Sequence, residues 1–337
     1  MYTDDDLQSA IKAGVLDQPT VDALRSHLAQ RRGTATADEE PFRLVTSFND
    51  VFVLIACAIV LVSIGLVFKG GSYPLGAIGI AASAWLLAEF FTRRRRMALP
   101  SIALLLAFVG GVWVATGVLL DADTRAAPSR AEEWLFPSAF AALAALVHWF
   151  RFKVPITVAA GTAALAMTFL ASMAQFFNTS SGPLFSGICF VAGLGVFVFA
   201  MYWDSRDVKR LTYRSDVAFW LHVLAAPMII HSLMGIFNVS FAGSKQTELA
   251  LTILAIYFLM AVISLAIDRR ALMVSGLVYV LVALTEWISV QSGNAFSFPI
   301  VGLTIGSALL LLSAFWQRAR QAVLRLLPPA IKQYLAT

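Results

Sequence analysis

Long apolar runs, separated by short polar turns, dominate this chain. Ten such runs can be placed, at about 51–68, 74–91, 97–120, 134–150, 154–177, 183–203, 217–237, 249–267, 271–290 and 299–316. They have the length of about 18 residues or more that a helix needs to cross the hydrocarbon core of a bilayer. Because they are continuously apolar and do not alternate with polar residues, they predict helices and not the strands of a barrel. The sequence therefore predicts an all-α, polytopic membrane helix bundle of about ten transmembrane helices, in residues 49–316.

The first 32 residues differ from the rest, because their apolar positions are few and have helical spacing. Leu7 and Ile11 are four residues apart and so share one helix face. Gly14 is suited to end that helix, and Asp17 is suited to cap a second one. We expect residues 1–32 to form a small cytosolic helical hairpin, which is too small to bury much surface by itself.

Two polar segments flank the predicted spans. Residues 33–48, which begin with Gly-Thr-Ala-Thr-Ala-Asp-Glu-Glu-Pro-Phe, are expected to be a linker. Residues 317–337 are expected to hold a C-terminal amphipathic helix, with its apolar residues on one side and Arg318, Arg320 and Arg325 largely on another. This pattern is typical of a helix that lies on the surface of an anionic bilayer.

Composition supports a membrane protein. Hydrophobic residues make up 59% of the chain and charged residues only 13%, whereas a soluble domain carries about 25% charged residues. The first 48 residues contain no apolar core of a signal peptide. Cys57 and Cys189 each lie alone inside an apolar run, so they are interpreted as small buried hydrophobic residues and not as a disulfide or metal site.

A run of four arginines at 93–96 determines the expected orientation. Lysine and arginine next to transmembrane helices resist translocation and stay in the cytoplasm. When the ten spans are counted from this loop, 21 of the 25 basic residues fall on the cytoplasmic side and 4 on the outer side. Shifting the count by one span would reverse this ratio. Both termini are therefore expected in the cytoplasm.

Two features of the spans have more than one interpretation. Every second span ends in a basic loop, which indicates either a duplication of hairpins or the common way in which membrane helices end. Gly110-Gly111 and Pro227 interrupt the third and seventh spans. Such interruptions mark either a transport site or a simple kink.

The N-terminal part of the chain carries a resemblance. The residues concerned are Ile11-Lys12-Ala13-Gly14-Val15-Leu16-Asp17 and Val21-Asp22-Ala23-Leu24, followed by the apolar stretch 48–68. In these residues the chain resembles an uncharacterised family of bacterial predicted membrane proteins, a domain of unknown function. Members of that family carry a short cytosolic helical hairpin before multiple transmembrane helices. The resemblance implies a location in the bacterial inner (plasma) membrane, and it implies no activity or catalytic residue.

Ionisable and polar residues inside the spans are the candidates for a functional site, because they are costly there. Counting about 1.5 Å per residue from the inner end of each span puts Glu286 at about 22 Å and His231 at about 21 Å. Thr168 and Thr116 fall at similar depths. We expect these four residues to form a polar layer in the outer half of the membrane, in which Glu286 and His231 can pair. They either bind a substrate or only satisfy one another near wet headgroups.

Other polar residues have simpler interpretations. Glu89 lies four residues before Arg93, which predicts an ion pair within one helix at the cytoplasmic interface. His148 and His222 lie near the inner ends of their spans and are predicted to be interfacial. The sequence has no phosphate-binding loop, His-Glu-x-x-His or Gly-x-Ser-x-Gly motif, and no nucleic-acid-binding motif accompanies its basic residues. No catalytic residue, metal ligand or cofactor is assigned.

Two classes of function fit these observations. The first is a transporter or permease for a small solute, with Glu286 and His231 as a proton-linked or substrate-binding pair. The second is a non-catalytic scaffold or regulatory protein that recruits a partner, or self-associates, through residues 4–32. An intramembrane enzyme ranks third, because no nucleophile–base pair or metal cluster is visible. A cavity from the outer face to Glu286 would favour the first class, and an exposed apolar groove on residues 7–28 would favour the second.

Cysteine labelling tests the predicted orientation, in a variant that lacks the native Cys57 and Cys189. A cysteine in place of Ser181 or Asn294 should react with a membrane-impermeant thiol reagent added to intact cells, because both positions are predicted in outer turns. A cysteine in place of Ser205 should react only after the membrane is opened. Labelling at Ser205 in intact cells would overturn the predicted threading.

Overall fold

The computed structural model describes residues 4–24, 48–68, 73–120, 131–207, 210, 212–237, 246–292 and 297–328. In this part of the chain the regular secondary structure is helical, without a strand. The chain divides into two compact units, 1–42 and 43–337, and this division falls within the segment predicted as a linker.

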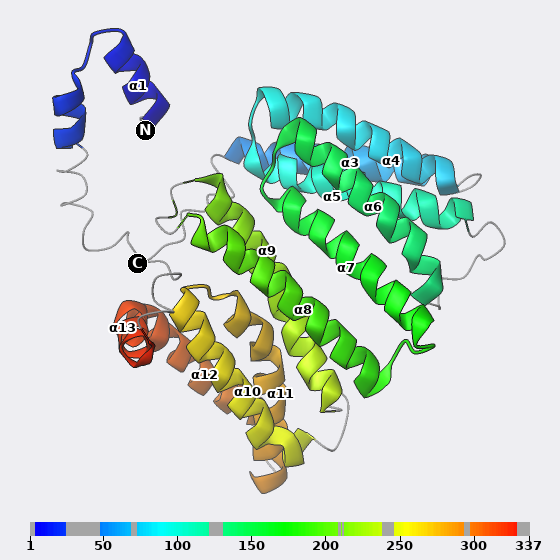
Figure 1. Ribbon diagram of the computed structural model, residues 1–337, viewed down its shortest axis with the longest axis vertical. Coiled ribbons are helices and arrows are strands. Elements are labelled where there is room, and N and C mark those ends of the chain that lie inside the picture. Colours follow the sequence, from blue (N-terminus) through cyan, green and yellow to red (C-terminus); the bar gives the residue numbers. More distant parts are fainter. Residues whose placement is uncertain are drawn as a thin grey trace. The chain divides into compact units, whose positions relative to one another are not determined.

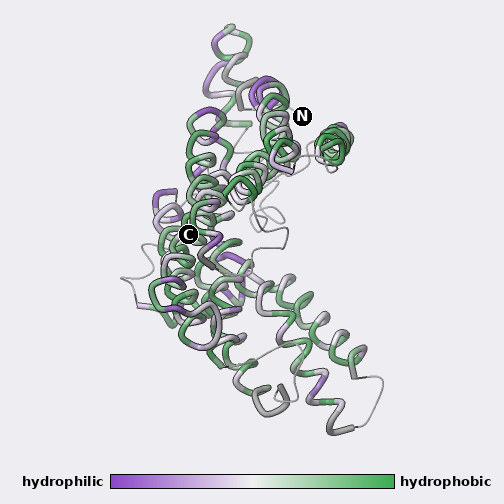
Figure 2. The backbone as a smooth tube through the Cα atoms, turned by 90° about the vertical axis from the view of Figure 1, so that its right-hand side faces the viewer, coloured by the Kyte–Doolittle hydropathy of each residue, from purple (hydrophilic) through white to green (hydrophobic). Residues whose placement is uncertain are grey.

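The larger unit is a series of long helices joined by short connections (Figure 1). In chain order they are α3 Phe48–Val67, α4 Tyr73–Ala88, the π-helical turn η1 Glu89–Arg94, α5 Ala98–Leu120, the 3₁₀ turn η2 Ala131–Trp134, α6 Leu135–Phe152, α7 Ile156–Phe176, α8 Gly182–Ser205, α9 Tyr213–Ile236, α10 Gln246–Ile267, α11 Ala271–Ser292, α12 Ser297–Ala314 and α13 Trp316–Leu326. Figure 2 shows hydrophobic residues along most of each long helix, interrupted by short hydrophilic stretches.

These helices confirm the predicted spans. Among the described residues, nine helices, α3 to α11, are long and apolar enough to cross a membrane, and α4 does so together with its π-helical turn. The tenth, α12, forms a pair with α13 that is bent by 77°. The predicted boundaries differ from the observed ones by no more than four residues. The protein is therefore an all-α, multi-pass membrane protein.

The bend after α12 turns α13 away from the direction of the span, as a helix on the membrane surface requires. Arg318 and Arg325 are exposed on α13, as predicted. Arg320 is instead buried, and its Nε atom lies 3.9 Å from the carboxylate of Asp268. The prediction for Arg320 was wrong because this residue lies three and four residues before Val323 and Leu324, so it shares their face, which packs against the other helices. The rest of the predicted C-terminal segment, residues 329–337, lies outside the described residues.

The spans pack as a row of neighbouring hairpins, with α9 at its middle (Figure 1). The helices α3, α4 and α5 pack together, α6 pairs with α7, α8 with α9, and α10 with α11. Because α9 contacts α7 and also α11, it joins the two halves of the row. It is the most buried span, with 56% of its most apolar stretch buried against at most 39% in any other described span. The largest hydrophobic core surrounds it, and Leu221 and Ile230 of α9 are fully shielded from solvent.

Small residues let neighbouring helices approach closely. A Cβ atom at Gly193 of α8 would lie 3.1 Å from the side chain of Ile229 on α9, so a larger residue would push the two helices apart. A Cβ atom at Gly111 of α5 would lie 3.0 Å from the carbonyl oxygen of Ala77 on α4. The helices are continuous at the predicted interruptions, since α5 passes through Gly111 and α9 through Pro227. Gly111 therefore serves the packing of α5 against α4 within an unbroken helix.

The smaller unit contains α1, Asp4–Lys12, and a second helical segment that begins at Gln18. Gly14 has a φ of +70°, and the N–H of Val15 donates to the carbonyl oxygen of Ala10 at 3.0 Å. This bond across five residues belongs to the Schellman motif, in which glycine adopts the left-handed conformation that ends a helix. Gly14 therefore ends α1, as predicted. Residues 25–32 of the predicted hairpin, and residues 33–47 of the linker, lie outside the described residues.

Candidate functional site

The structure gives His231 a different partner from the predicted one. The Nδ1 atom of His231, on α9, makes a hydrogen bond with the hydroxyl group of Tyr279, on α11. Glu286 is exposed, and it makes no hydrogen bond or ion pair with the other described residues. The predicted pairing of His231 with Glu286 was therefore wrong.

The physical reason is that two residues at the same count from the starts of their helices lie at the same depth only if the two helices start at the same depth. One contact between these elements joins Ser215 on α9 to Arg269, just before α11, and another joins His231 to Tyr279. The two contacts are 16 residues apart on α9 but only 10 residues apart between Arg269 and Tyr279. The two helices are therefore shifted along their axes by several residues relative to each other. Glu286 lies seven residues, or about two turns, beyond the level that His231 reaches.

The two predicted threonines are each satisfied by their own helix. The hydroxyl groups of Thr116 and Thr168 donate to the carbonyl oxygens four residues earlier, at 2.8 Å and 2.9 Å. Such a bond uses the only hydrogen that a hydroxyl group can donate. No hydrogen bond or ion pair among the described residues links any two of Thr116, Thr168, His231 and Glu286, so they do not form one polar cluster. A role in substrate binding for each of them stays a prediction.

A lateral pocket of about 580 Å³ lies between α6, α7 and α8. This volume is within the range of about 300–1,000 Å³ that small-molecule sites occupy. Of the four predicted site residues, Thr168 alone lines it. Trp149 and Trp203, each close to the last turn of its helix, also belong to the wall. Most of the remaining wall consists of alanine, leucine and valine side chains from α6 and α7.

His148 lies directly behind this wall. Its Nδ1 atom is 3.3 Å from the hydroxyl oxygen of Thr157, which lines the pocket. The imidazole is completely buried, and the ring centres of Trp85, Phe108 and Phe152 lie 6.1, 5.9 and 4.5 Å from its own. The prediction of an interfacial histidine was therefore wrong for His148. Its ring is part of the packing between helices, because aromatic side chains from α4, α5 and α6 surround it.

A buried ion pair joins the end of α8 to the start of α11. Arg269 donates to the two carboxylate oxygens of Asp204, from Nη2 at 2.6 Å and from Nε at 3.2 Å. The second of these oxygens also lies 3.1 Å from the Nε2 atom of His222, on α9. The exposed fractions are 9% for Asp204, 2% for Arg269 and 1% for His222, so these groups are screened from water. His222 was also predicted to be interfacial, and its burial beside Asp204 corrects that prediction.

This arrangement satisfies charges that would otherwise be unfavourable in a dry environment. Arg269 also reaches Ser215 on α9, with Nη2 at 3.3 Å from the hydroxyl oxygen and 3.4 Å from the carbonyl oxygen. A buried charge that lacks such partners is strongly destabilising. The bidentate contact further restricts the relative orientation of the two side chains. The cluster therefore holds α8, α9 and α11 in one arrangement.

A second polar cluster surrounds Asp268, in the connection between α10 and α11. Arg210 donates to its carboxylate from Nη1 at 3.0 Å, and Trp316 donates from Nε1 at 2.7 Å. Arg210 also donates from Nη2 to the carbonyl oxygens of Ile267 and Asp268, both at 3.1 Å. Asp268 thereby connects the α8–α9 loop to α13.

The predicted contact of Glu89 is confirmed and extended. Arg93 lies 3.4 Å from the carboxylate of Glu89, as the spacing within one helix predicts. The shorter contacts come from Arg151 at the end of α6, whose Nε and Nη2 atoms donate to the two carboxylate oxygens at 2.6 Å and 2.9 Å. Glu89 therefore also connects η1, which continues α4, to α6.

Sequence reasoning missed the cluster of Asp204, His222 and Arg269. A count of residues within one helix does not reveal contacts between helices, and here Asp204 contacts residues that are 18 and 65 positions away in the chain. One signal was present, because Asp204 lies in the last turn of α8 and Arg269 closely follows α10, and both of these spans end at the arginine-rich side. An acidic residue there has arginines of neighbouring loops within reach.

Among the described residues, no group of three or more His, Cys, Asp or Glu side chains is arranged to hold a metal ion. Comparisons with protein-family models, with curated proteins and with solved structures found no match to this chain.

Replacing Arg269 with methionine should destabilise the membrane domain, because Asp204 would stay buried without its charged partner. Removing one member of a buried ion pair costs about 3–5 kcal/mol, which thermal or denaturant unfolding in detergent can measure. Arg214→Met is a matched control, since Arg214 is exposed in the first turn of α9. Its loss should stay within about 0.5 kcal/mol. Equal losses for both variants would contradict a structural role of the cluster.

Proposed function

We propose that this chain is a multi-pass protein of the bacterial inner membrane that binds a membrane-soluble, largely apolar molecule in the pocket between α6, α7 and α8. Its resemblance to a bacterial membrane-protein family, in residues 11–24 and 48–68, supports the inner-membrane location. The ratio of 21 to 4 basic residues supports cytoplasmic positions for both termini.

The observation that carries the proposal is the chemistry of the pocket wall. The described residues that line the pocket include no charged side chain. Of its threonines, Thr162 and Thr168 donate to their own helix, at 2.8 Å and 2.9 Å, and Thr157 contacts His148. A hydrophilic molecule would lose its water here without gaining enough hydrogen bonds in return. A hydrocarbon chain or ring makes no hydrogen bonds with water that it could lose, so the pocket favours an apolar molecule.

The exposure of the wall supports entry from the bilayer. Leu143, Leu146 and Leu165 belong to the wall, and each is at least 50% exposed on the surface of the spans. That surface faces lipid chains in a membrane protein. A polar end of the bound molecule would lie beside Trp149 and Trp203, because tryptophan is enriched where the membrane meets water.

This proposal differs from the small-solute permease predicted from the sequence in the kind of molecule that is bound. Neither Glu286 nor His231 lines any of three pockets found among the described residues. These pockets lie between α6 and α8, between α3 and α5, and between α10 and α12. Binding of a membrane-soluble molecule is therefore better supported than binding of a water-soluble one. Movement of that molecule across the membrane stays a prediction.

Recruitment of a partner through residues 4–32 is a second candidate. One observation favours it: the smaller unit is compact by itself and leaves Val15 and Leu24 exposed, by 75% and 42%. Isolated exposed apolar residues are common on protein surfaces. These two residues support partner recruitment less strongly than the uncharged lining of the α6–α8 pocket supports the binding of an apolar molecule.

Photo-crosslinking tests the proposed binding. A fatty acid with a photoreactive group on its chain should label the purified protein mainly at residues that line the α6–α8 pocket, as mapped by peptide mass spectrometry. Leu165→Trp fills the pocket from an exposed position and should lower labelling there by more than half. Leu184→Trp is the matched control, because Leu184 is similarly exposed, at 56% against 61% for Leu165, and does not line the pocket. Uniform labelling of all lipid-facing residues, unchanged in Leu165→Trp, would refute the proposal.

A further inference from the structure

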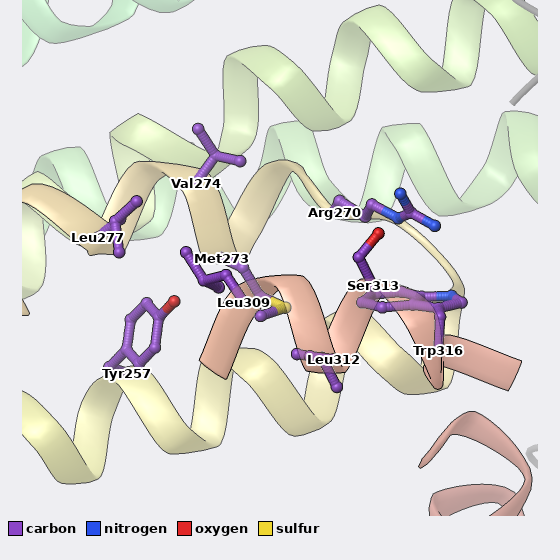
Figure 3. A pocket seen from close by; sticks show the side chains of 9 residues that line it. All are labelled: Tyr257, Arg270, Met273, Val274, Leu277, Leu309, Leu312, Ser313 and Trp316. Carbon is purple, nitrogen blue, oxygen red and sulfur yellow. The ribbon is translucent and has the colours of Figure 1, made fainter. Parts of the chain in front are cut away.

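A smaller pocket, of about 110 Å³, lies between α10, α11 and α12 at the arginine-rich ends of the spans (Figure 3). Its deeper part is apolar and includes Met273, Leu277 and Leu309. At the other end, Figure 3 shows the guanidinium group of Arg270 near the ring of Trp316. The pocket thus has an apolar part and a cationic end, unlike the pocket between α6 and α8.

The guanidinium group of Arg270 is held in place and still available for binding. Its central carbon lies 4.8 Å from the ring centre of Trp316, in a cation–π contact. Stacking of this kind uses the flat face of the guanidinium group and leaves the N–H groups at its edge free to donate. Arg270 is exposed, and it makes no ion pair with the other described residues.

Neighbouring acidic residues are already engaged. Asp268 receives hydrogen bonds from Arg210 at 3.0 Å and from Trp316 at 2.7 Å, and Asp204 receives them from Arg269. Neither carboxylate therefore compensates the charge of Arg270. The N–H groups of Arg270 are therefore available to an anion from outside the protein.

Two further side chains add to the polar end of the pocket. Ser313 lines it, and Figure 3 shows the hydroxyl group of Ser313 directed toward the side on which Arg270 lies. Arg318, in the first turn of α13, is exposed and stacks on Phe315, with its guanidinium carbon 5.3 Å from the ring centre. These groups lie where α13 bends away from α12 by 77°. A molecule with an anionic head and an apolar tail matches this combination.

We propose that the pocket between α10, α11 and α12 binds an anionic phospholipid from the leaflet that borders the arginine-rich ends of the spans. The phosphate accepts hydrogen bonds from Arg270 and Ser313. Part of one acyl chain lies along Met273, Leu277 and Leu309. A soluble phosphate compound would use only the polar end and would leave the apolar walls uncovered, so a lipid fits the whole pocket better.

Native mass spectrometry of the purified full-length protein, stripped of lipid and titrated with defined lipids, tests this proposal. Phosphatidylglycerol should bind more tightly than phosphatidylcholine with the same acyl chains. Arg270→Gln should lower the affinity for phosphatidylglycerol about fivefold, the effect of one cationic side chain near a membrane surface, and leave that for phosphatidylcholine nearly unchanged. Arg270→Lys, which keeps the charge, should retain most of the preference.

Two further variants separate the site from general surface charge. Val274→Trp fills the pocket from a position that is 66% exposed and should weaken the binding of both lipids. Arg206→Gln should change neither, because Arg206 is an exposed arginine stacked on Tyr202 at 4.3 Å that does not line the pocket.

Several results would overturn the proposal. Equal affinities for the two lipids would do so, as would an equal loss in Arg206→Gln and Arg270→Gln, or phosphatidylglycerol binding unchanged in Val274→Trp. Glycerol 3-phosphate provides the remaining comparison. If it binds as tightly as the lipid, with the same dependence on Arg270, the site is one for soluble phosphate and the lipid proposal is wrong.

Discussion

The contact between Asp204 and Arg269 is the interaction on which the arrangement of the second half of the membrane domain depends. It joins the hairpin of α8 and α9 to that of α10 and α11, at a place where both charges are screened from water. Apolar packing alone sets no unique register between membrane helices, because lipid chains are as apolar as the side chains. A charged pair must meet or remain unsatisfied, so it selects one register.

Other polar contacts act in the same way elsewhere in this unit. Arg151 brings the end of α6 to Glu89 in the π-helical turn η1, and Asp268 brings the α8–α9 loop to α13. These contacts lie at one end of the spans, where basic residues are concentrated. The surface toward the bilayer is left to apolar side chains and small residues. Pockets on that surface are consequently suited to molecules that are soluble in the membrane.

Local patterns explain why much of the fold could be predicted from the sequence. The spans follow from the length and continuity of their apolar runs, and Gly14 ends α1 because glycine adopts the required left-handed conformation. The contact of Glu89 with Arg93 also lies within one helix, so its spacing predicts it. Arg151, which contacts the same carboxylate from α6, is 62 residues away and has no such signal.

The candidate sites were less predictable, because they depend on how neighbouring helices are aligned. His231 contacts Tyr279 instead of Glu286 because α9 and α11 are shifted along their axes relative to each other. Counting residues along each helix separately does not reveal this shift. His148 and His222 are buried because neighbouring helices cover them, although each lies near the end of its own span. The predicted positions of the two histidines along their helices were correct, but their burial by neighbouring helices was not predicted.

A double-mutant cycle between Asp204 and Arg269 tests the central claim most directly. The free energy of unfolding in detergent would be measured for the wild type, Asp204→Leu, Arg269→Met and the double variant. If the pair sets the packing of α8 against α11, the double variant should be more stable than the sum of the single effects predicts, by about 2 kcal/mol, within the range of about 0.5–3 kcal/mol seen for residues in one network. Effects that add to within about 0.5 kcal/mol would show that the two residues act independently and would contradict this account.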